Sequence, residues 1–350
     1  MVFNLRTFSF TESDEDDPTP PKSFSLKELR VATHDFSHRN VVGGGDFGMV
    51  YRGHLADGSQ VVVKRAFIID QEREENFGRE MQVARSVSTH PNVVSLRGFC
   101  RTKRELLLVY PLMIHNSLAS NLGAQSERPT GPLDWTTRTR IALGAATGLA
   151  HLHDQGNFRI MHRHICPHSI LLNSQFEAVI TGFCSSVIMH KRNVQGRTIK
   201  SQVEDSVVSG SSSQTYHCYD DVYVDNHIHG VNGFIAPEYR NTGKCTLKND
   251  VSPTGERFLG SSLDRRLGTF FRRCSGNYVE KEAEGLVRLA LLCAHENPSV
   301  RPEMSEVVRM LESQFLQRDT SSRSSWSQSE CDSTPYYSFP PSPSPMGIAP

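Results

Sequence analysis

Short apolar runs separated by turn residues dominate the first third of the chain. These runs are rich in Val, Leu and aromatic residues, as strands usually are, and they cover residues 41–53, 59–67, 93–100 and 105–113. The turn LADGSQ at 55–60 joins the first two runs and predicts a hairpin. A helical pattern interrupts the runs at residues 71–87. The pattern therefore predicts a small β-rich unit that contains a helix.

Helical spacing takes over later in the chain, beginning with residues 133–154. A shorter helix is expected within residues 24–38, where apolar side chains recur at helical spacing: Phe24, Leu26, Leu29 and Val31. We predict an α+β protein of two lobes, with a β-rich N-lobe at 39–113 and a helical C-lobe at 114–315.

Polar segments flank and interrupt the two lobes. Residues 1–23 include the acidic, Pro-rich stretch TESDEDDPTPPKS, and we expect a disordered leader there. Residues 316–350 are rich in Ser and Pro and are expected to be a disordered tail. A polar insert at about 195–228 has SGSSSQ in its middle, and loops of such length are more often functional or disordered than structured.

Composition narrows the class of protein. The chain has 350 residues, 37% of them hydrophobic and 22% charged, which is typical of a globular protein with a core. Its 38 basic residues equal its 38 acidic ones, which argues against a general attraction to nucleic acid or to membranes. The eight cysteines are scattered without a C-x-x-C pair, as expected of reduced thiols. We expect a cytoplasmic protein with no membrane span and no nucleic-acid partner.

Glycines at three positions mark a turn between two predicted strands: Gly43, Gly45 and Gly48. Glycine lets the backbone approach phosphate oxygens, although a plain hairpin turn explains this pattern better when it stands alone. Lys64 follows on the next strand and can pair with phosphate as a point charge. On the following helix Glu80 shares a face with three apolar residues, Phe77, Met81 and Ala84. An acid on such a face needs a partner, and Lys64 is the candidate.

The order of these motifs resembles the protein-kinase fold, because LLLVYPLM, HRH…ILL, IAPEY and RPEMSEVVRMLE follow in kinase order. The segments FSLKELRVATHDFS, LDWTTRTRIALGAATGLAHLHD and APEYRNTGK are similar to plant receptor-like Ser/Thr kinases of the leucine-rich-repeat, somatic-embryogenesis type. The resemblance covers about residues 24–315. It implies a bilobal kinase fold, with residues 24–38 as a juxtamembrane-like segment.

The resemblance also implies a nucleotide site. The three glycines would cover the phosphates, Lys64 and Glu80 would form the catalytic ion pair, and Val50 and Leu171 would sandwich the base. Val62 stands where the family usually has Ala, and overpacking of this kind typically costs roughly 1–3 kcal/mol. We expect weak ATP binding, and a pocket that is simply filled as core explains the same residues nearly as well.

Three positions of the family's chemistry are substituted. His164 stands at the Asp that accepts the substrate proton, and a neutral imidazole can accept a proton but carries no negative charge. Ser169 replaces a metal-binding Asn, although a hydroxyl can still bind Mg²⁺. Gly182 replaces the Asp that is the main Mg²⁺ ligand, Phe183 is kept, and Cys184 replaces the last Gly of that motif. We therefore expect little use for Mg²⁺ and little phosphoryl transfer.

Histidines at 162, 164 and 168 have a spacing that invites a metal site. However, His162 and Arg163 match family positions with a structural role, the histidines lie on a loop, and no Cys or carboxylate joins them at a useful spacing. We expect no metal site there. Cys166 stands where the family usually has a basic residue.

The predicted C-lobe is shortened. Asp250 and Val251 match the start of the family's long apolar helix, but the sequence that follows contains a Pro, glycines and many charges. The resemblance resumes near Gly276, so a segment is missing near 252–275. Glu238 and Arg301 match residues that form an ion pair in kinases.

Three functions follow from these features. The chain can be a pseudokinase that regulates partners, a weakly active Ser/Thr kinase that transfers the ATP γ-phosphate to protein hydroxyls, or a decayed gene copy that folds poorly. We expect the first, a kinase-fold protein that regulates or scaffolds receptor-kinase signalling, with receptor kinases or their substrates as partners.

Overall fold

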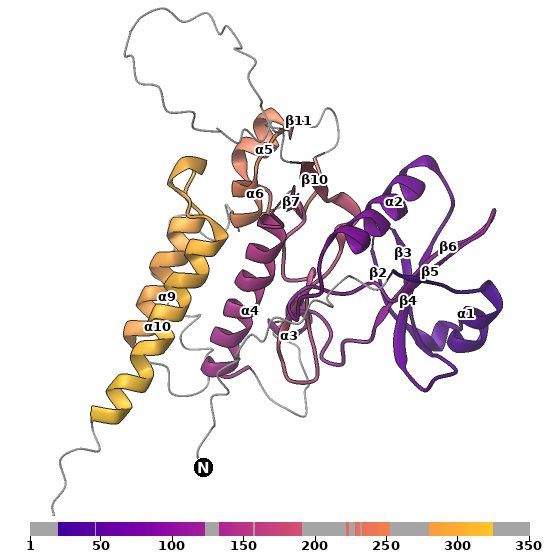
Figure 1. Cartoon of the computed structure of the whole chain (residues 1–350), viewed down its shortest axis with the longest axis horizontal. Coiled ribbons are helices and arrows are strands. Elements are labelled where there is room, and N and C mark those ends of the chain that lie inside the picture. Colours follow the sequence, from indigo (N-terminus) through magenta and orange to yellow (C-terminus); the bar gives the residue numbers. More distant parts are fainter. Residues whose placement is uncertain are drawn as a thin grey trace, which may run out of the picture.

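The computed structural model describes residues 20–45, 47–122, 133–156, 158–190, 222–223, 228–231, 233–252 and 280–324. These residues form a β-rich lobe, indigo to purple in Figure 1, and a helical lobe that contains the later elements. The predicted α+β, bilobal arrangement is confirmed. The predicted leader and tail, the insert near 195–228 and the segment near 252–275 lie largely outside the described residues.

The N-lobe is built on a six-stranded sheet in the order β1-β5-β6-β4-β3-β2. The strands are β1 (Lys22–Ser23), β2 (Val41–Gly44), β3 (Gly48–His54), β4 (Gln60–Ala66), β5 (Gly98–Arg101) and β6 (Leu106–Pro111). Strand β1 pairs in parallel with β5, and the other neighbours are antiparallel. The predicted hairpin joins β3 to β4, with Gly58 at a φ of 81° in its turn. Residues 22–23 were assigned to the leader, but they form β1 because Lys22 donates its N–H to the Arg97 carbonyl at 3.0 Å.

Both faces of the sheet are buried, which explains why β6 is an unbroken apolar run. Alternate side chains of a strand point to opposite faces. Leu106, Leu108 and Tyr110 therefore join the core cluster that contains residues of α2 (Gln71–Ser86). The intervening Leu107 and Val109 join the cluster on the other face.

Helix α1 (Leu26–Thr33) covers one face of the sheet and begins at the N-cap Ser25. Its Leu29 is fully buried against the strands. Val31, which we assigned to the same apolar face, is instead 72% exposed. Two residues along an α-helix amount to a rotation of about 200°, so a residue two positions after Leu29 points away from the sheet.

Helix α2 packs against the opposite face and begins at Asp70, whose carboxylate accepts the N–H of Arg73 at 2.8 Å. The predicted inward face is confirmed, because the helix buries three of its members: Phe77, Glu80 and Met81. This orientation aims the carboxylate of Glu80 into the lobe.

The C-lobe is mainly helical, with α3 (Leu118–Leu122), α4 (Trp135–His153), α5 (Pro237–Thr242), α6 (Leu247–Val251), α9 (Glu280–Cys293) and α10 (Met304–Ser324). Short antiparallel pairs join β7 (Phe158–Met161) to β10 (Val187–His190), β8 (Ile170–Leu172) to β9 (Ala178–Ile180), and β11 (Val222–Tyr223) to β12 (Lys244–Cys245). Among the described residues, none of the helices has the length and apolar character that crossing a membrane requires.

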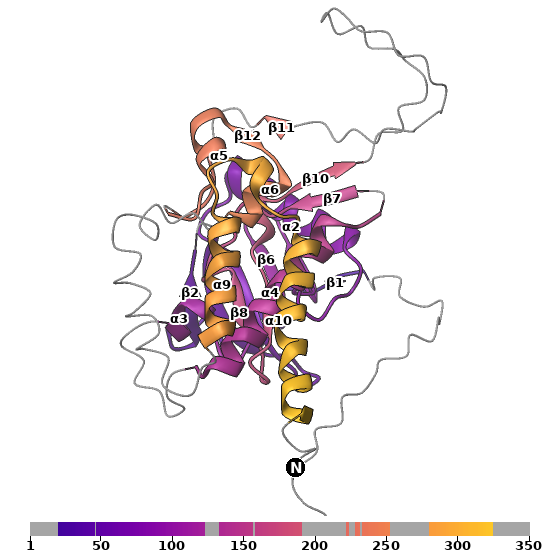
Figure 2. The same cartoon turned by 90° about the vertical axis from the view of Figure 1, so that its left-hand side faces the viewer.

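Helix α10 lies along α4, with α9 beside it (Figure 1). Figure 2 shows the same helices from the side of the C-lobe. Leu149 and Leu152 of α4 share a core cluster with Val307 and Leu311 of α10. The tail was expected to begin at residue 316, but α10 continues to Ser324. Of the family's long helix after the APEY motif, the described part is α6, which has five residues.

Candidate active site

Lys64 on β4 faces Glu80 on α2, and the predicted ion pair is present with 3.3 Å between Lys64 Nζ and Glu80 Oε1. The Glu80 side chain is 1% exposed and that of Lys64 19%. Burial alone would lower the pKa of Lys64 and raise that of Glu80, but each charge stabilises the other. The net effect raises the pKa of Lys64 and lowers that of Glu80, so both remain charged near neutral pH.

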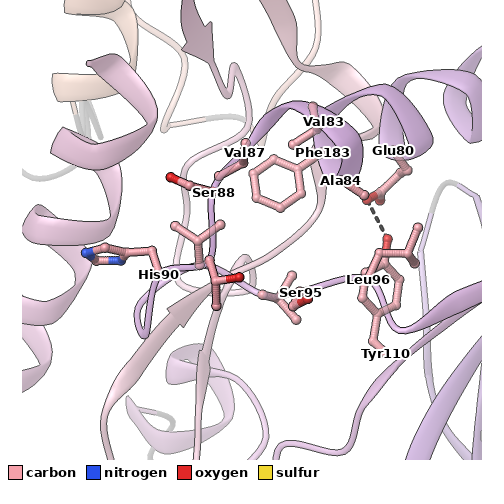
Figure 3. A pocket seen from close by; sticks show the side chains of 13 residues that line it. Glu80, Val83, Ala84, Val87, Ser88, His90, Ser95, Leu96, Tyr110 and Phe183 are labelled. Atoms are coloured by element: carbon pink, nitrogen blue, oxygen red, sulfur yellow. Dashed lines mark hydrogen bonds between the residues drawn. The ribbon is translucent and has the colours of Figure 1, made fainter. Parts of the chain in front are cut away.

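Two further donors hold the Glu80 carboxylate. The Tyr110 hydroxyl donates to Oε2 at 2.6 Å (Figure 3), and the Cys184 thiol donates to Oε1 at 3.2 Å. We did not anticipate either contact from the sequence. Tyr110 offered a signal, because a buried tyrosine at the end of an aliphatic strand needs a partner for its hydroxyl. Cys184 offered none beyond its replacement of a glycine.

A cavity of about 40 Å³ lies behind this carboxylate, between α2 and the chain that leads into β5 (Figure 3). Its lining includes Val83, Leu96, Tyr110 and Phe183. A cavity of this size has room for a few waters at most, which is too little for a nucleotide.

The glycine turn has two kinds of glycine. A Cβ at Gly48 would lie 1.8 Å from the carbonyl oxygen of Arg65, so the neighbouring strand alone requires glycine there. At Gly43 and Gly45 a Cβ would meet no atom within 4 Å among the described residues. These two positions therefore leave the backbone open to a ligand, whereas Gly48 is explained by strand packing.

The predicted adenine-contacting residues come from both lobes. Val50 is directly opposite Lys64 across β3 and β4, and Val62 is two residues before Lys64, so the three share one face of the sheet. Val50 and Val62 are half-buried. Leu171 lies in β8 of the C-lobe and is also half-buried.

The loop that carries the His-Arg-His motif is held by Asp250 of α6. The backbone N–H groups of His162 and Arg163 donate to its two carboxylate oxygens, each at 2.7 Å. His153 Nε2 lies 3.0 Å from the same carboxylate, which is buried. We had noted Asp250 only as the start of a missing helix, yet the short α6 keeps the anchoring contact.

His162 and Arg163 are both buried and contact neighbouring parts of the C-lobe. The His162 ring donates from Nε2 to the Thr181 carbonyl at 3.0 Å and packs edge-on against Phe183. Burial lowers the pKa of His162, so the ring is neutral. The Arg163 guanidinium donates to the Ser185 carbonyl at 3.1 Å and to the Tyr239 hydroxyl at 2.5 Å.

The predicted Glu238–Arg301 pair is also present, as two parallel hydrogen bonds of 2.6 and 2.8 Å. Arg301 is 1% exposed and donates to three backbone carbonyls as well. This network ties α5 to the turn before α10.

Comparisons with known proteins agree with this geometry. The model of the family described as protein tyrosine and serine/threonine kinase matches residues 36–207. Two probable LRR receptor-like serine/threonine-protein kinases of Arabidopsis thaliana are 35% and 36% identical to the chain, and the LRR receptor kinase SERK2 of Oryza sativa subsp. japonica is 36% identical. Each alignment covers 84% of this chain and 48% of the relative. The chain belongs to the plant receptor-like serine/threonine kinases. It spans about half the length of the curated relatives that it matches.

Within this receptor-like kinase, the two metal positions do not fit Mg²⁺. The Ser169 hydroxyl is buried, accepts the N–H of Cys166 at 3.0 Å and donates to the Cys166 carbonyl at 2.9 Å. Both of these hydrogen bonds lie within its own loop. Gly182 has no side chain, and Mg²⁺ requires several oxygen ligands. Among the described residues, no group of three or more His, Cys, Asp or Glu side chains is arranged to hold a metal.

His164, at the position of the kinase's proton acceptor, is half-buried, and its backbone N–H donates to His162 Nδ1 at 3.2 Å. Its imidazole hydrogen-bonds the thiol of Cys166. Burial would raise the pKa of that thiol, but this hydrogen bond and two backbone N–H groups lower it to about 7. The position that the resemblance aligns with the catalytic Asp therefore carries an imidazole next to a readily ionised thiol.

Proposed function

We propose that this chain is a catalytically impaired member of its family, a pseudokinase that binds ATP weakly and regulates or scaffolds receptor-kinase signalling. The observation that carries the proposal is Gly182, because it removes the side chain that would hold Mg²⁺ against the phosphates. The engaged hydroxyl of Ser169 and the imidazole of His164 support the same conclusion. Loss of the metal ligand and of the base together should lower phosphoryl transfer by several orders of magnitude.

The retained features support a folded domain with a signalling role rather than the product of a decayed gene copy. The ion pair between Lys64 and Glu80, the anchor at Asp250 and the pair between Glu238 and Arg301 are all complete. Receptor kinases or their substrates are the partners that the family suggests. Lys64 and the open backbone at the glycine turn are the groups available to ATP, and the bulk of Val62 would weaken its binding.

The alternative is a weakly active Ser/Thr kinase, and the intact Lys64–Glu80 pair favours it. Comparing the wild type with the double variant His164→Asp/Gly182→Asp separates the two. A Cβ at 182 would meet no described atom within 4 Å, but the φ of 91° there is one that residues other than glycine rarely adopt, so Gly182→Asp adds backbone strain. The side chain has room, and a thermal melt of the double variant as cooperative as that of the wild type would show that the fold tolerates the strain.

The assay is transfer of radiolabelled γ-phosphate to the chain itself and to a mixture of Ser/Thr peptides, with Lys64→Met as the inactive control. We expect the wild type to equal the control and the double variant to exceed both by orders of magnitude. The proposal would be refuted, in favour of the weak kinase, by two results together. The wild type would transfer phosphate at a level similar to that of the double variant, and Lys64→Met would abolish this transfer.

A further inference from the structure

Two contacts join α2 to the start of the activation segment, the stretch from Gly182 to Glu238 that corresponds by resemblance to the segment of that name in kinases. The Cys184 thiol donates to Glu80 Oε1 at 3.2 Å, and the Arg79 guanidinium donates to the Cys184 carbonyl at 3.2 Å. Cys184 belongs to the short 3-10 helix η2 (Phe183–Ser185), which packs against α2. One residue thus contacts α2 through both its side chain and its backbone.

The side-chain contact is specific to this chain. The family motif ends in Gly at this position, and a glycine could make only the backbone contact. Burial and the negative charge of Glu80 both raise the pKa of the Cys184 thiol, so it stays protonated and remains a donor across the physiological pH range. Oε1 of Glu80 consequently accepts from both Lys64 and Cys184, whereas Oε2 accepts from Tyr110.

We infer that Cys184 is a positioning residue whose thiol holds α2, and with it the Lys64–Glu80 pair, against the start of the activation segment without nucleotide or metal. The metal positions next to it cannot supply such an organising contact, since one is a glycine and the other is a serine engaged with its own loop. The thiol supplies it from within the chain.

The inference deepens the proposed function and rests on it, because a kinase-fold scaffold that acts without phosphoryl transfer needs a fixed N-lobe whether or not ATP is bound. It can still be tested independently, since the position of α2 is measured without any phosphoryl transfer. A glycine at 184 would leave the backbone contact from Arg79 and remove the thiol donor, so the variants isolate the side chain.

The experiment is hydrogen–deuterium exchange of the whole chain, followed on peptides that cover α2, with and without ATP. We expect Cys184→Ala and Cys184→Gly to raise the exchange rate of the protected α2 amides about five-fold, as the loss of a single hydrogen bond predicts. Cys184→Ser keeps a donor and should restore exchange to within about two-fold of the wild type. Cys293→Ala, which removes another buried thiol in α9, is the matched control and should leave α2 unchanged.

Addition of ATP should not alter α2 exchange in the wild type. If the α2 amides of Cys184→Ala exchanged at the wild-type rate, the inference would be overturned, because the thiol would then not stabilise α2. Equal acceleration in Cys184→Ser and Cys184→Ala would overturn it as well, since side-chain volume and not hydrogen bonding would be responsible. An ATP-dependent slowing of α2 exchange in the wild type would also contradict it. Phosphoryl transfer by the same wild-type sample would refute the proposed function and leave the result on α2 standing.

Discussion

Replacing Asp250 with Ala tests whether the short α6 still anchors the catalytic loop. The substitution removes the acceptor of two buried backbone N–H groups, each at 2.7 Å from the carboxylate. A buried donor left without an acceptor costs about 1–3 kcal/mol, so the two together cost about 2–6 kcal/mol. The contact from His153 at 3.0 Å is lost as well. We therefore expect Asp250→Ala to lower the free energy of unfolding by about 3–5 kcal/mol.

Urea denaturation of the whole chain, followed by circular dichroism and by tryptophan fluorescence, measures this loss, and coincident transitions would justify a single free energy. Asp250→Asn keeps one carbonyl oxygen and should fall between the wild type and Asp250→Ala. Glu284→Ala in α9 is the control, because that side chain is 60% exposed and the change should alter stability by less than about 0.5 kcal/mol. A loss below about 1 kcal/mol for Asp250→Ala would show that α6 does not hold the loop.

Three further changes test other parts of the description. Arg301→Met removes the charged partner of the Glu238 carboxylate, which keeps its hydrogen bond from Asn249, and should cost about 3–5 kcal/mol in the same urea experiment; a loss near zero would contradict the buried network. Gly48→Ala should destabilise the chain because its Cβ would lie 1.8 Å from a backbone oxygen, whereas Gly45→Ala should be nearly neutral, and equal melting temperatures would be the contrary result. The Cys166 thiol has a pKa of about 7 in the folded chain and 9.0 ordinarily, so its contribution to stability is absent below pH 7, grows between pH 7 and 9 and is complete above 9. The melting temperature of the wild type should therefore rise relative to that of Cys166→Ser over this range, and a constant difference from pH 6 to 9 would refute the lowered pKa.

Much of the fold could be predicted because strands and helices leave local patterns in the sequence and because the motifs come in the order found in kinases. The alternation in β3 and β4, the apolar face of α2 and the order of the kinase motifs were enough to pair Lys64 with Glu80 and Glu238 with Arg301. For Lys64 and Glu80, the acid on an apolar helix face required a charged partner, whereas the pair of Glu238 and Arg301 followed from the resemblance to kinases.

The remaining features depend on three-dimensional neighbours that sequence spacing does not reveal. The contact of Cys184 with Glu80 joins residues 104 positions apart. A buried thiol does not need a hydrogen-bond partner, so nothing in the sequence pointed to this contact. The sequence pattern does not reveal the role of Asp250, because it shows this residue only as the start of a helix that we expect to be shortened, whereas the carboxylate needs only its own short turn. The sequence shows only that the Ser169 hydroxyl can bind Mg²⁺. It does not show that this hydroxyl hydrogen-bonds the backbone N–H and carbonyl of Cys166.

The packing of α10 along α4 has a consequence for the order in which the chain folds during synthesis. Helix α4 ends at His153 and α10 begins at Met304, and within the same lobe Trp135 Nε1 donates to Glu282 across 147 positions at 2.8 Å. Contacts so distant in sequence close large loops and form late, whereas the N-lobe sheet can form as soon as β6 leaves the ribosome. Until α10 emerges, the apolar side of α4 has no cover from it. A chain cut before residue 304 would therefore expose that side to water and to other unfinished chains.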